Sequence, residues 1–470
     1  MKIEQIYTGC LAHAAYYIES DGEAAIFDPL REVQPYLDRA VEDGARIKYV
    51  FETHFHADFV SGHLDLRKKT GADIVFGPTA KPGYEAIIAK DGQVFQVGKY
   101  KIKVLHTPGH TMESTTYLLI DEHGKEHGII TGDTLFIGDV GRPDLAQHVV
   151  EDLTEEKLAG YLYESLRNKI MPLPDDLIVY PNHGAGSACG KMMSKETTDT
   201  LGNQKATNYA LRADMTKEEF IDELLTGLTT PPGYFPQNVL MNIKGYDSFD
   251  QVRDRAETPM SPEEFEMTAN ASQALVLDTR ADEEFAKGFI PNSINIGLKG
   301  NFAPWVGEMI PDVKQEILLI AEPGKEEEAI TRLARVGYDG VIGYLDGGFQ
   351  SWKDAGKEVD RVERLDVSSF ENIFNDDIPV FDVRKKSEFD SEHLMGAENI
   401  PLNEINKHLA EFPRNKKFYL HCAGGYRSMI AASILKQRGW DNFADLRGGF
   451  DRIKESNLPK SDYICPTTLL

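Results

Sequence analysis

The chain has 470 residues and a formal net charge of −25. That length exceeds what one hydrophobic core serves, so about three domains are expected, and the acidic balance argues against nucleic acid and anionic membranes as partners. No run of about 18 apolar residues occurs, so we expect no membrane span. The sparse cysteines and an N-terminus without signal-peptide character predict reduced thiols in a cytoplasmic protein.

Short apolar runs alternate with helical segments over the first part of the chain. The pattern predicts strands at residues 16–18, 24–27 and 48–51 and helices at 35–42 and 62–69. From residue 206 onward, a predicted helix at 216–226 precedes a Pro/Gly breaker at 230–233. We interpret this stretch as connecting structure that closes a first domain of residues 1–255.

Side chains that bind metals follow four of the apolar runs. They are His54, His56 and Asp58 after residues 49–51, His110 after 102–105, Asp133 after 128–130, and His183 after 177–180. Imidazole is the commonest metal ligand in proteins. A single histidine on a strand is more often structural, but four strand ends that deliver such residues to one place predict a metal site at the edge of a sheet.

These motifs resemble the metallo-β-lactamase superfamily over about residues 1–205. The matching runs are Thr53-His54-Phe55-His56-Ala57-Asp58, Pro108-Gly109-His110-Thr111, Gly132-Asp133-Thr134 and Pro181-Asn182-His183. The resemblance implies an αββα sandwich with the site at the strand ends. Hydrolases such as glyoxalase II carry a further histidine directly after the aspartate, where it helps to hold a second metal. Here that position is Phe59, which has no lone pair to donate.

The mononuclear branch of the same superfamily includes the persulfide dioxygenases. That resemblance implies one Fe(II) per chain, held by His54, His110 and Asp133, with open positions for a persulfide and O2. The remaining residues, His56, Asp58 and His183, would orient ligands, move protons or act as optional metal ligands. Zinc is the alternative metal, because imidazole suits both ions.

The residues after His183 bear on the thiol that carries the persulfide. Glutathione-using dioxygenases continue with an aspartate and a tyrosine, whereas this chain has a Gly/Ala-rich loop at residues 184–190. Glycine lets a substrate approach the backbone closely. This departure from the family pattern argues against glutathione, so coenzyme A, another low-molecular-weight thiol or sulfide is the expected carrier of the persulfide, with glutathione as the alternative. We interpret Cys10 and Cys189 as ordinary loop thiols, with sulfur carriage by either of them as the alternative.

The rest of the chain contains an internal repeat with a spacing of about 101 to 104 residues, which is the size of a domain. Residues 276–280 recur as 380–384, and residues 346–349 recur as 447–450. Each copy alternates strand-like and helical runs, so each is predicted to be a small α/β domain with a parallel sheet. The predicted domains are residues 256–360 and 361–470.

The second copy carries the run Cys422-Ala423-Gly424-Gly425-Tyr426-Arg427 between a predicted strand at 417–420 and a predicted helix at 429–438. Backbone N–H groups and a helix N-terminus stabilise a thiolate, and an arginine adds a fixed charge for an anion. The pattern resembles the rhodanese sulfurtransferases and makes Cys422 and Arg427 the predicted catalytic residues. In the first copy Ala321 and Glu326 stand at these positions, so we interpret it as an inactive spacer that positions the outer two domains, with a residual binding role as the alternative.

Together these resemblances imply a fused persulfide dioxygenase and rhodanese of sulfide detoxification. Its expected substrates and products are a low-molecular-weight persulfide, O2, and sulfite or thiosulfate. One alternative is a dinuclear-zinc, glyoxalase II-like thioester hydrolase with a rhodanese, and another is a non-catalytic sulfur carrier or sensor. The resemblance also favours a homo-oligomer.

Overall fold

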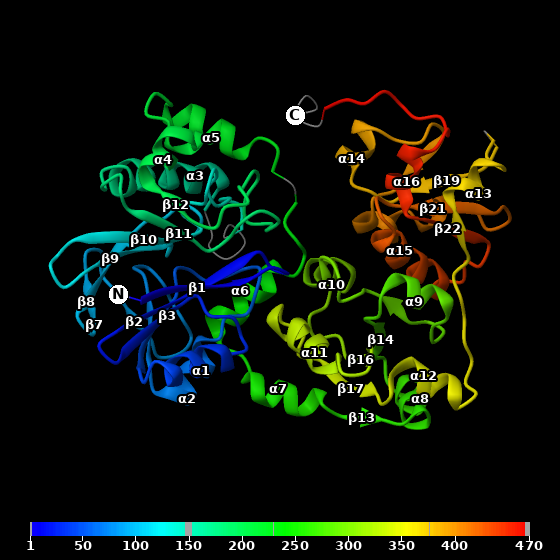
Figure 1. Cartoon of the computed structure of the whole chain (residues 1–470), viewed down its shortest axis with the longest axis horizontal. Coiled ribbons are helices and arrows are strands. Elements are labelled where there is room, and N and C mark those ends of the chain that lie inside the picture. The colour runs from blue at the N-terminus through cyan, green and yellow to red at the C-terminus, as the bar shows by residue number, and fades with distance from the viewer. Residues whose placement is uncertain (1, 146–152, 229, 376, 466–470) are drawn as a thin grey trace. The chain divides into compact units, whose positions relative to one another are not determined.

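The computed structural model describes residues 2–145, 153–228, 230–375 and 377–465. The chain divides into two compact units, one of Met1–Gln251 with Leu333–Tyr338 and the other of Val252–Arg332 with Asp339–Leu470. Figure 1 labels many of their helices and strands, numbered in chain order. Among the described residues, none of the helices has the length and apolar character that a bilayer crossing requires.

The first unit is built around two mixed β-sheets. One has the strand order β1-β2-β3-β4-β5-β6 and the other the order β12-β11-β10-β9-β8-β7. The strands of the first sheet are β1 (Lys2–Thr8), β2 (His13–Ser20), β3 (Glu23–Phe27), β4 (Arg46–Phe51), β5 (Asp73–Phe76) and β6 (Ile87–Ile88). Those of the second are β7 (Val94–Val97), β8 (Tyr100–His106), β9 (Thr115–Ile120), β10 (Glu126–Gly132), β11 (Ile178–Pro181) and β12 (Asp199–Thr200).

Helices cover the outer face of each sheet of this unit. They are α1 (Gln34–Glu42), α2 (His63–Thr70), α3 (Glu155–Ser165), the π-helical turn η1 (Leu166–Ile170), α4 (Leu201–Thr207), the 3-10 turn η2 (Tyr209–Leu211) and α5 (Lys217–Leu225). Helix α6 (Phe235–Lys244) lies against the loop that follows β4. Helix α7 (Phe249–Ala256) follows at the boundary between the units. The helices predicted at residues 35–42, 62–69 and 216–226 are confirmed as α1, α2 and α5.

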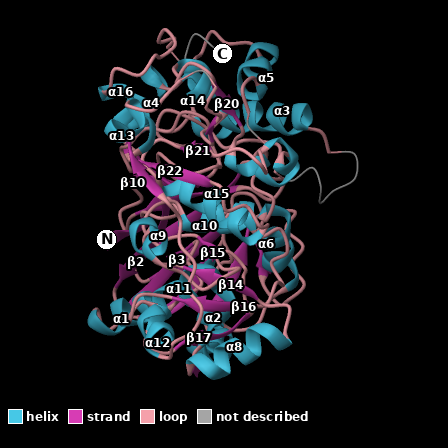
Figure 2. Ribbon diagram, turned by 90° about the vertical axis from the view of Figure 1, so that its right-hand side faces the viewer, coloured by secondary structure: helices cyan, strands magenta, loops and turns pink. Residues whose placement is uncertain are grey.

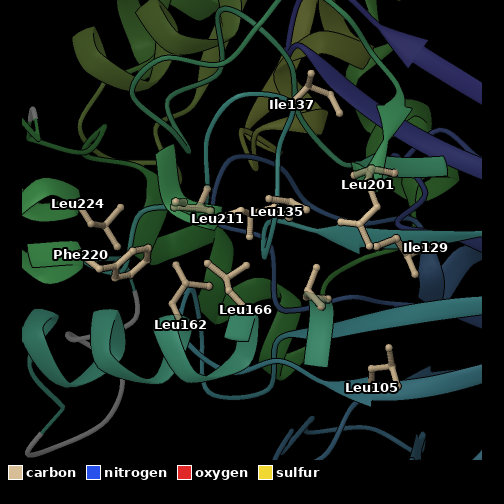
Figure 3. Packing of buried hydrophobic residues seen from close by; sticks show 14 of the residues in the cluster. Leu105, Ile129, Leu135, Ile137, Leu162, Leu166, Leu201, Leu211, Phe220 and Leu224 are labelled. Atoms are coloured by element: carbon tan, nitrogen blue, oxygen red, sulfur yellow. The ribbon is translucent and has the colours of Figure 1, made fainter. Parts of the chain in front are cut away.

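Separate hydrophobic clusters hold these layers together. Phe27 and Phe51 from the first sheet pack with Tyr117 and Ile130 from the second, so this cluster fills the space between the sheets. A second cluster joins the first sheet to α1 and α2. The third lies between the other sheet and α3 to α5, where Leu162 and Leu166 point toward Leu135 and Leu211 (Figure 3). This order of helix, sheet, sheet and helix confirms the predicted αββα sandwich.

The second unit contains the two copies of the sequence repeat. The elements of the first copy are β13 (Pro259–Met260), α8 (Pro262–Ala271), β14 (Leu275–Asp278), α9 (Asp282–Lys287), β15 (Ile294–Asn295), α10 (Phe302–Met309), β16 (Ile317–Ile320), α11 (Glu326–Arg335), β17 (Val341–Leu345) and α12 (Gly348–Asp354). Those of the second are β18 (Arg364–Asp366), α13 (Val367–Glu371), β19 (Val380–Asp382), α14 (Lys386–Ser391), β20 (Ala397–Asn399), η3 (Leu402–Lys407), η4 (Leu409–Glu411), β21 (Phe418–His421), α15 (Tyr426–Gln437), β22 (Phe443–Arg447) and α16 (Gly449–Glu455).

The two copies share one sheet topology. The orders β13-β17-β16-β14-β15 and β18-β22-β21-β19-β20 place equivalent strands in equivalent positions, and the recorded strand pairs of both sheets are parallel. Helix α15 lies against β21 and β22, as the ribbon in Figure 2 also shows. The predicted parallel α/β domains are therefore confirmed.

One helix boundary differs from the sequence prediction. Helix α15 begins at Tyr426, whereas the pattern of apolar residues predicts a start at 429. Gly425 precedes the helix with φ of 119°, a conformation that glycine adopts without a steric penalty. Because the backbone turns there, Arg427 lies in the first turn of the helix and not in the loop before it.

Candidate metal centre and sulfur-transfer loop

His54, His110 and Asp133 come together at the ends of three strands. His54 follows β4, His110 follows β8 and Asp133 directly follows β10, and all three side chains are buried. Nε2 of His54 lies 3.9 Å and Nε2 of His110 lies 3.4 Å from Oδ2 of Asp133. These atoms form one of the groups in the described structure whose geometry could hold a metal ion.

The atoms that face this cluster are suited to ligate a cation. Nε2 of His54 and Oδ2 of Asp133 are buried without a hydrogen-bond partner among the described residues, which is costly unless another group satisfies them. Nδ1 of His110 donates to the carbonyl of Arg142 at 2.7 Å, so its Nε2 lone pair is directed at the cluster. Burial lowers the pKa of His54 well below its usual value, which keeps the imidazole in its neutral, ligating form. The side chains present therefore fit a metal ion.

Asp58, His183 and Cys189 form a second buried group of possible ligands. Nε2 of His183 lies 2.9 Å from Oδ2 of Asp58, and Nδ1 lies 2.9 Å from Oδ1 of Asp133, so the ring bridges the two groups. Burial acts to lower the pKa of His183, but these carboxylates outweigh it and raise the pKa to about 10. Burial also raises the pKa of the Cys189 thiol well above its usual value.

Sequence reasoning assigned Cys189 no place in a cluster with Asp58 and His183. The cysteine lies in the Gly/Ala-rich loop after β11, where nothing in the local pattern indicates which way the chain turns. Its carbonyl accepts the N–H of Arg142 at 3.0 Å, and the Arg142 guanidinium donates to the carbonyl of Ala188 at 3.2 Å. This loop is therefore anchored to the residue whose carbonyl orients His110.

His56 belongs to a third group, with Asp28 and Glu52. Its Nε2 lies 2.9 Å from Oδ1 of Asp28 and 3.4 Å from Oε2 of Glu52. Burial acts to lower the pKa of His56, but the two carboxylates raise it well above its usual value. Asp28 and Glu52 were not among the predicted site residues. The only available signals were that each lies at the end of a predicted strand and that Asp28 precedes a proline.

Phe59 fills the position next to these groups with an apolar ring. It is fully buried. Its ring stacks on His56 with centroids 4.3 Å apart and an interplanar angle of 28°, and its centroid lies 4.3 Å from that of His13. A ring packed in this way offers no donor atom to a second metal.

Helix α6 supports the loop that carries the first ligands. The side-chain amide of Asn242 donates to the carbonyls of His56 and Phe59, both at 2.8 Å, and its oxygen accepts the N–H of Ser61 at 2.9 Å. The hydroxyl of Tyr234 donates to the carbonyl of Asp58 at 3.3 Å. The sequence interpretation of this region as connecting structure missed this support.

A pocket opens beside His110. Its walls are largely apolar and include Phe55, Met112, Val239 and Ile243, and Glu113 contributes an ionisable group. The carboxylate of Glu113 accepts the N–H of Phe55 at 3.0 Å, which ties it to the ligand loop. A small molecule in this pocket would contact apolar side chains and also His110, one of the three candidate metal ligands.

Cys422 lies in the loop between β21 and α15. Its side chain is buried, and Sγ accepts the N–H of Gly425 at 3.1 Å. Arg427 is held by Glu388, with Nη1 to Oε2 at 2.5 Å and Nη2 to Oε1 at 2.9 Å. The carbonyl of Cys422 accepts the N–H of Phe450 at 2.7 Å, so the repeated run at residues 447–450 closes the loop from the other side.

The equivalent loop of the first copy has different chemistry. Ala321 is buried at the position that corresponds to Cys422. The N–H of Gly324 donates to the carboxylate of Glu326 at 2.7 Å, so a side chain of the loop itself takes up a backbone donor. Both copies retain a buried Asp–Arg pair, Asp278–Arg280 in the first and Asp382–Arg384 in the second.

Comparisons with known proteins cover both units. The model of the metallo-beta-lactamase superfamily matches residues 8–183, and the model of the rhodanese-like domain matches residues 261–355 and 366–456. The crystal structure of a metallo-beta-lactamase from Staphylococcus aureus subsp. aureus COL is 33% identical with a TM-score of 0.64, and the match covers 73% of this chain and 98% of that one.

Curated relatives of the first unit fall into two activities. A hydroxyacylglutathione hydrolase of Rhizobium etli is 34% identical over 202 residues, which are 42% of this chain and 71% of the relative. The mitochondrial persulfide dioxygenase ETHE1 of Bos taurus is 27% identical over 231 residues, which are 45% of this chain and 82% of the relative. Relatives with these two names therefore match the first unit at similar identity.

Proposed function

We propose, from the premise that this chain belongs to the metallo-beta-lactamase superfamily and continues into two rhodanese-like domains, that it oxidises a low-molecular-weight persulfide and transfers sulfur. In the first reaction R–S–SH, O2 and water give R–SH, sulfite and two protons. In the second, Cys422 exchanges one sulfane sulfur atom between its own persulfide and sulfite or thiosulfate. The proposed division of labour places the first reaction in residues 1–255 and the second in 361–470.

The observation that supports the first reaction is the set of three converging atoms on His54, His110 and Asp133. Two imidazoles and one carboxylate are the donor set suited to a single non-heme iron with open positions, and such an iron supplies the activation of O2 and of the persulfide sulfur. His54 and His110 would hold it through Nε2, and Asp133 through Oδ2. The presence of Phe59 favours one metal ion over two, because its buried ring has no atom that could ligate a second ion.

The chain's own residues have three tasks in this reaction. The carbonyl of Arg142 keeps the His110 ring in its ligating tautomer. His183, placed between Asp58 and Asp133, holds a proton next to the cluster and can deliver it to the departing thiolate. The apolar pocket beside His110 would seat the organic part of the persulfide and exclude water from it.

Sulfur transfer is supported by the loop at Cys422. Its thiolate would attack the outer sulfur of thiosulfate, break the S–S bond and release sulfite, and the reverse attack by sulfite on the Cys422 persulfide would make thiosulfate. The N–H of Gly425 stabilises charge on Sγ. We propose that the first copy has no such activity, because Ala321 is not a nucleophile and Glu326 repels anions.

One observation favours a second candidate, a dinuclear-zinc thioester hydrolase. Asp58, His183 and Cys189 could supply ligands for a second ion even though Phe59 cannot. Thiolate, imidazole and carboxylate are all zinc ligands. The hydroxyacylglutathione hydrolases among the relatives are consistent with this candidate.

The deciding experiment combines metal analysis with activity. Protein loaded anaerobically with Fe(II) should bind about one ion per chain and consume O2 when a persulfide is added. We expect His110→Ala to remove both the iron and the oxygen uptake and to leave thiosulfate sulfurtransferase activity intact. Cys422→Ser should do the reverse. Hydrolysis of a thioester by zinc-loaded protein, without oxygen uptake by the iron form, would establish the second candidate instead.

A further inference from the structure

The first rhodanese-like copy contacts the loop of the second copy that carries Cys422. The hydroxyl of Tyr426, the residue that opens helix α15, donates to the carbonyl of Gly297 at 2.8 Å. Its ring lies over Gly300, where an added Cβ would sit 3.2 Å from the ring. Gly297 and Gly300 belong to the first copy, so the first copy holds one end of the second copy's loop.

A second contact between the two copies lies on the other side of the same loop and is made by charged side chains. Arg364 of the second copy is almost completely buried, and its Nε donates to Oδ2 of Asp445 at 2.9 Å. Its Nη1 lies 2.8 Å from Oε1 of Glu283 and 3.3 Å from Oδ2 of Asp282, both on α9 of the first copy. A buried guanidinium is held firmly only when such partners surround it.

These two contacts meet at Gly425. A Cβ placed on that glycine would lie 3.0 Å from Nη2 of Arg364 and 3.2 Å from Oδ2 of Asp282. Tyr426 is the next residue along the chain, and the N–H of Gly425 is the group that donates to Sγ of Cys422. The backbone that presents this N–H is therefore enclosed by side chains that the first copy holds in place.

We propose that the first copy is a positioning half of the second copy's active site, in which Gly297, Asp282 and Glu283 fix Tyr426 and Arg364 so that Gly425 directs its N–H at the Cys422 sulfur. This proposal rests on the sulfur-transfer role of Cys422 and replaces the interpretation of the first copy as a spacer. It gives the copy without a nucleophile a role beside the reactive loop. Asp282, Glu283 and Tyr426 are positioning residues, since they act through Gly425 and Arg364.

The test uses the full chain and measures the reactivity of Cys422 directly. Tyr426→Phe removes only the hydroxyl, and the double variant Asp282→Asn/Glu283→Gln removes only the two charges. The N–H of Gly425 stabilises negative charge on Sγ of Cys422. Partial loss of the Gly425 bond should therefore slow iodoacetamide alkylation of Cys422 at pH 7 by about three- to tenfold, and should move the midpoint of its pH profile upward. Cys422→Ser in each background identifies the signal of this cysteine.

Gln437→Ala is the matched control. Its side chain donates to the carbonyl of Asn292 at 3.0 Å, which also joins the two copies but lies at the far end of α15 from the loop. We expect this variant to keep the parental alkylation profile. Oxygen uptake at the metal site should be unchanged in every variant.

Two results would overturn the proposal. One is an unchanged alkylation profile in both Tyr426→Phe and the double variant. The other is an equal shift in Gln437→Ala, which would mean that any loosening between the copies has the same effect. A parent chain without sulfurtransferase activity would count against the proposed function. Alkylation of Cys422 needs no sulfur donor, so the positioning proposal could still be tested in that case.

Discussion

Arg427, the cation in the helical turn that follows the Cys422 loop, is bound by Glu388 through both of its terminal nitrogens, at 2.5 and 2.9 Å. The pair lies within the second rhodanese-like copy, between α14 and the first turn of α15. Burial acts to raise the pKa of Glu388, but Arg427 outweighs it and holds that pKa below its usual value. The positive charge of Arg427 is therefore compensated by Glu388 when no anion is bound.

Replacing Glu388 should change anion binding. In Glu388→Gln the guanidinium is no longer shared with a carboxylate, so the loop attracts thiosulfate more strongly. A partly exposed pair of this kind is worth up to about 1 kcal/mol, so we expect the KM for thiosulfate to fall about two- to fivefold. Steady-state sulfurtransferase assays measure it, with Glu398→Gln as an exposed control on β20. A higher KM would mean that Glu388 holds Arg427 in its working position.

Phe59→His should restore a donor beside the cluster. The imidazole would enter a fully buried position next to His56, where the Phe59 ring now stacks. We expect zinc bound after dialysis to rise from about one to about two ions per chain, as measured by elemental analysis. Phe59→Leu, which removes the ring without adding a donor, should stay at one. Two ions in the parent chain would contradict the mononuclear assignment.

Asn242→Ala should weaken the metal loop from a distance. The change leaves two buried carbonyls and one N–H without their partner. Unmet buried groups of this kind cost about 1 to 3 kcal/mol each, so the midpoint of thermal unfolding of the first unit should fall. Support of this kind around a ligand loop also affects metal affinity by about 10- to 100-fold. Competition with a chelator measures the affinity, and the exposed Asn203→Ala should leave both properties unchanged.

Asp445 should make the stability of the second unit depend on pH. Burial raises its pKa to about 6, despite the ion pair with Arg364. An unfolded aspartate titrates near 3.9, so folding binds a proton between these values, and the free energy of unfolding falls by about 3 kcal/mol as the pH rises from about 4 to above 6. Asp445→Asn has no carboxyl group to titrate, so its free energy of unfolding should not show this fall with pH. The free energy of unfolding of the variant relative to the parent should therefore rise over that range.

Urea unfolding followed by tryptophan fluorescence suits this measurement, because the three tryptophans, Trp305, Trp352 and Trp440, lie in the second unit. A difference between variant and parent that does not change with pH would contradict the raised pKa. Asp441→Asn, on an exposed residue after α15, provides the matched control.

The sequence by itself determined the short strands and helices, the domain-sized repeat and the principal candidate residues, because these features are local. The αββα sandwich was implied by the resemblance of the motifs to a known family and by no local pattern. Apolar runs of strand length followed by His54, His110 or Asp133 indicate both the strand and the polar residue at its end, and the six residues from Cys422 to Arg427 are contiguous in the sequence.

Only the tertiary structure decided which residues support these sites. Cys189 beside Asp58, Asn242 under the loop of His56, and Tyr426 on Gly297 each join parts of the chain that are far apart in sequence. A buried polar side chain finds its partner in the packed fold, and the packing of layers sets which distant groups meet. Local patterns of hydrophobicity and charge do not indicate which distant residues come into contact.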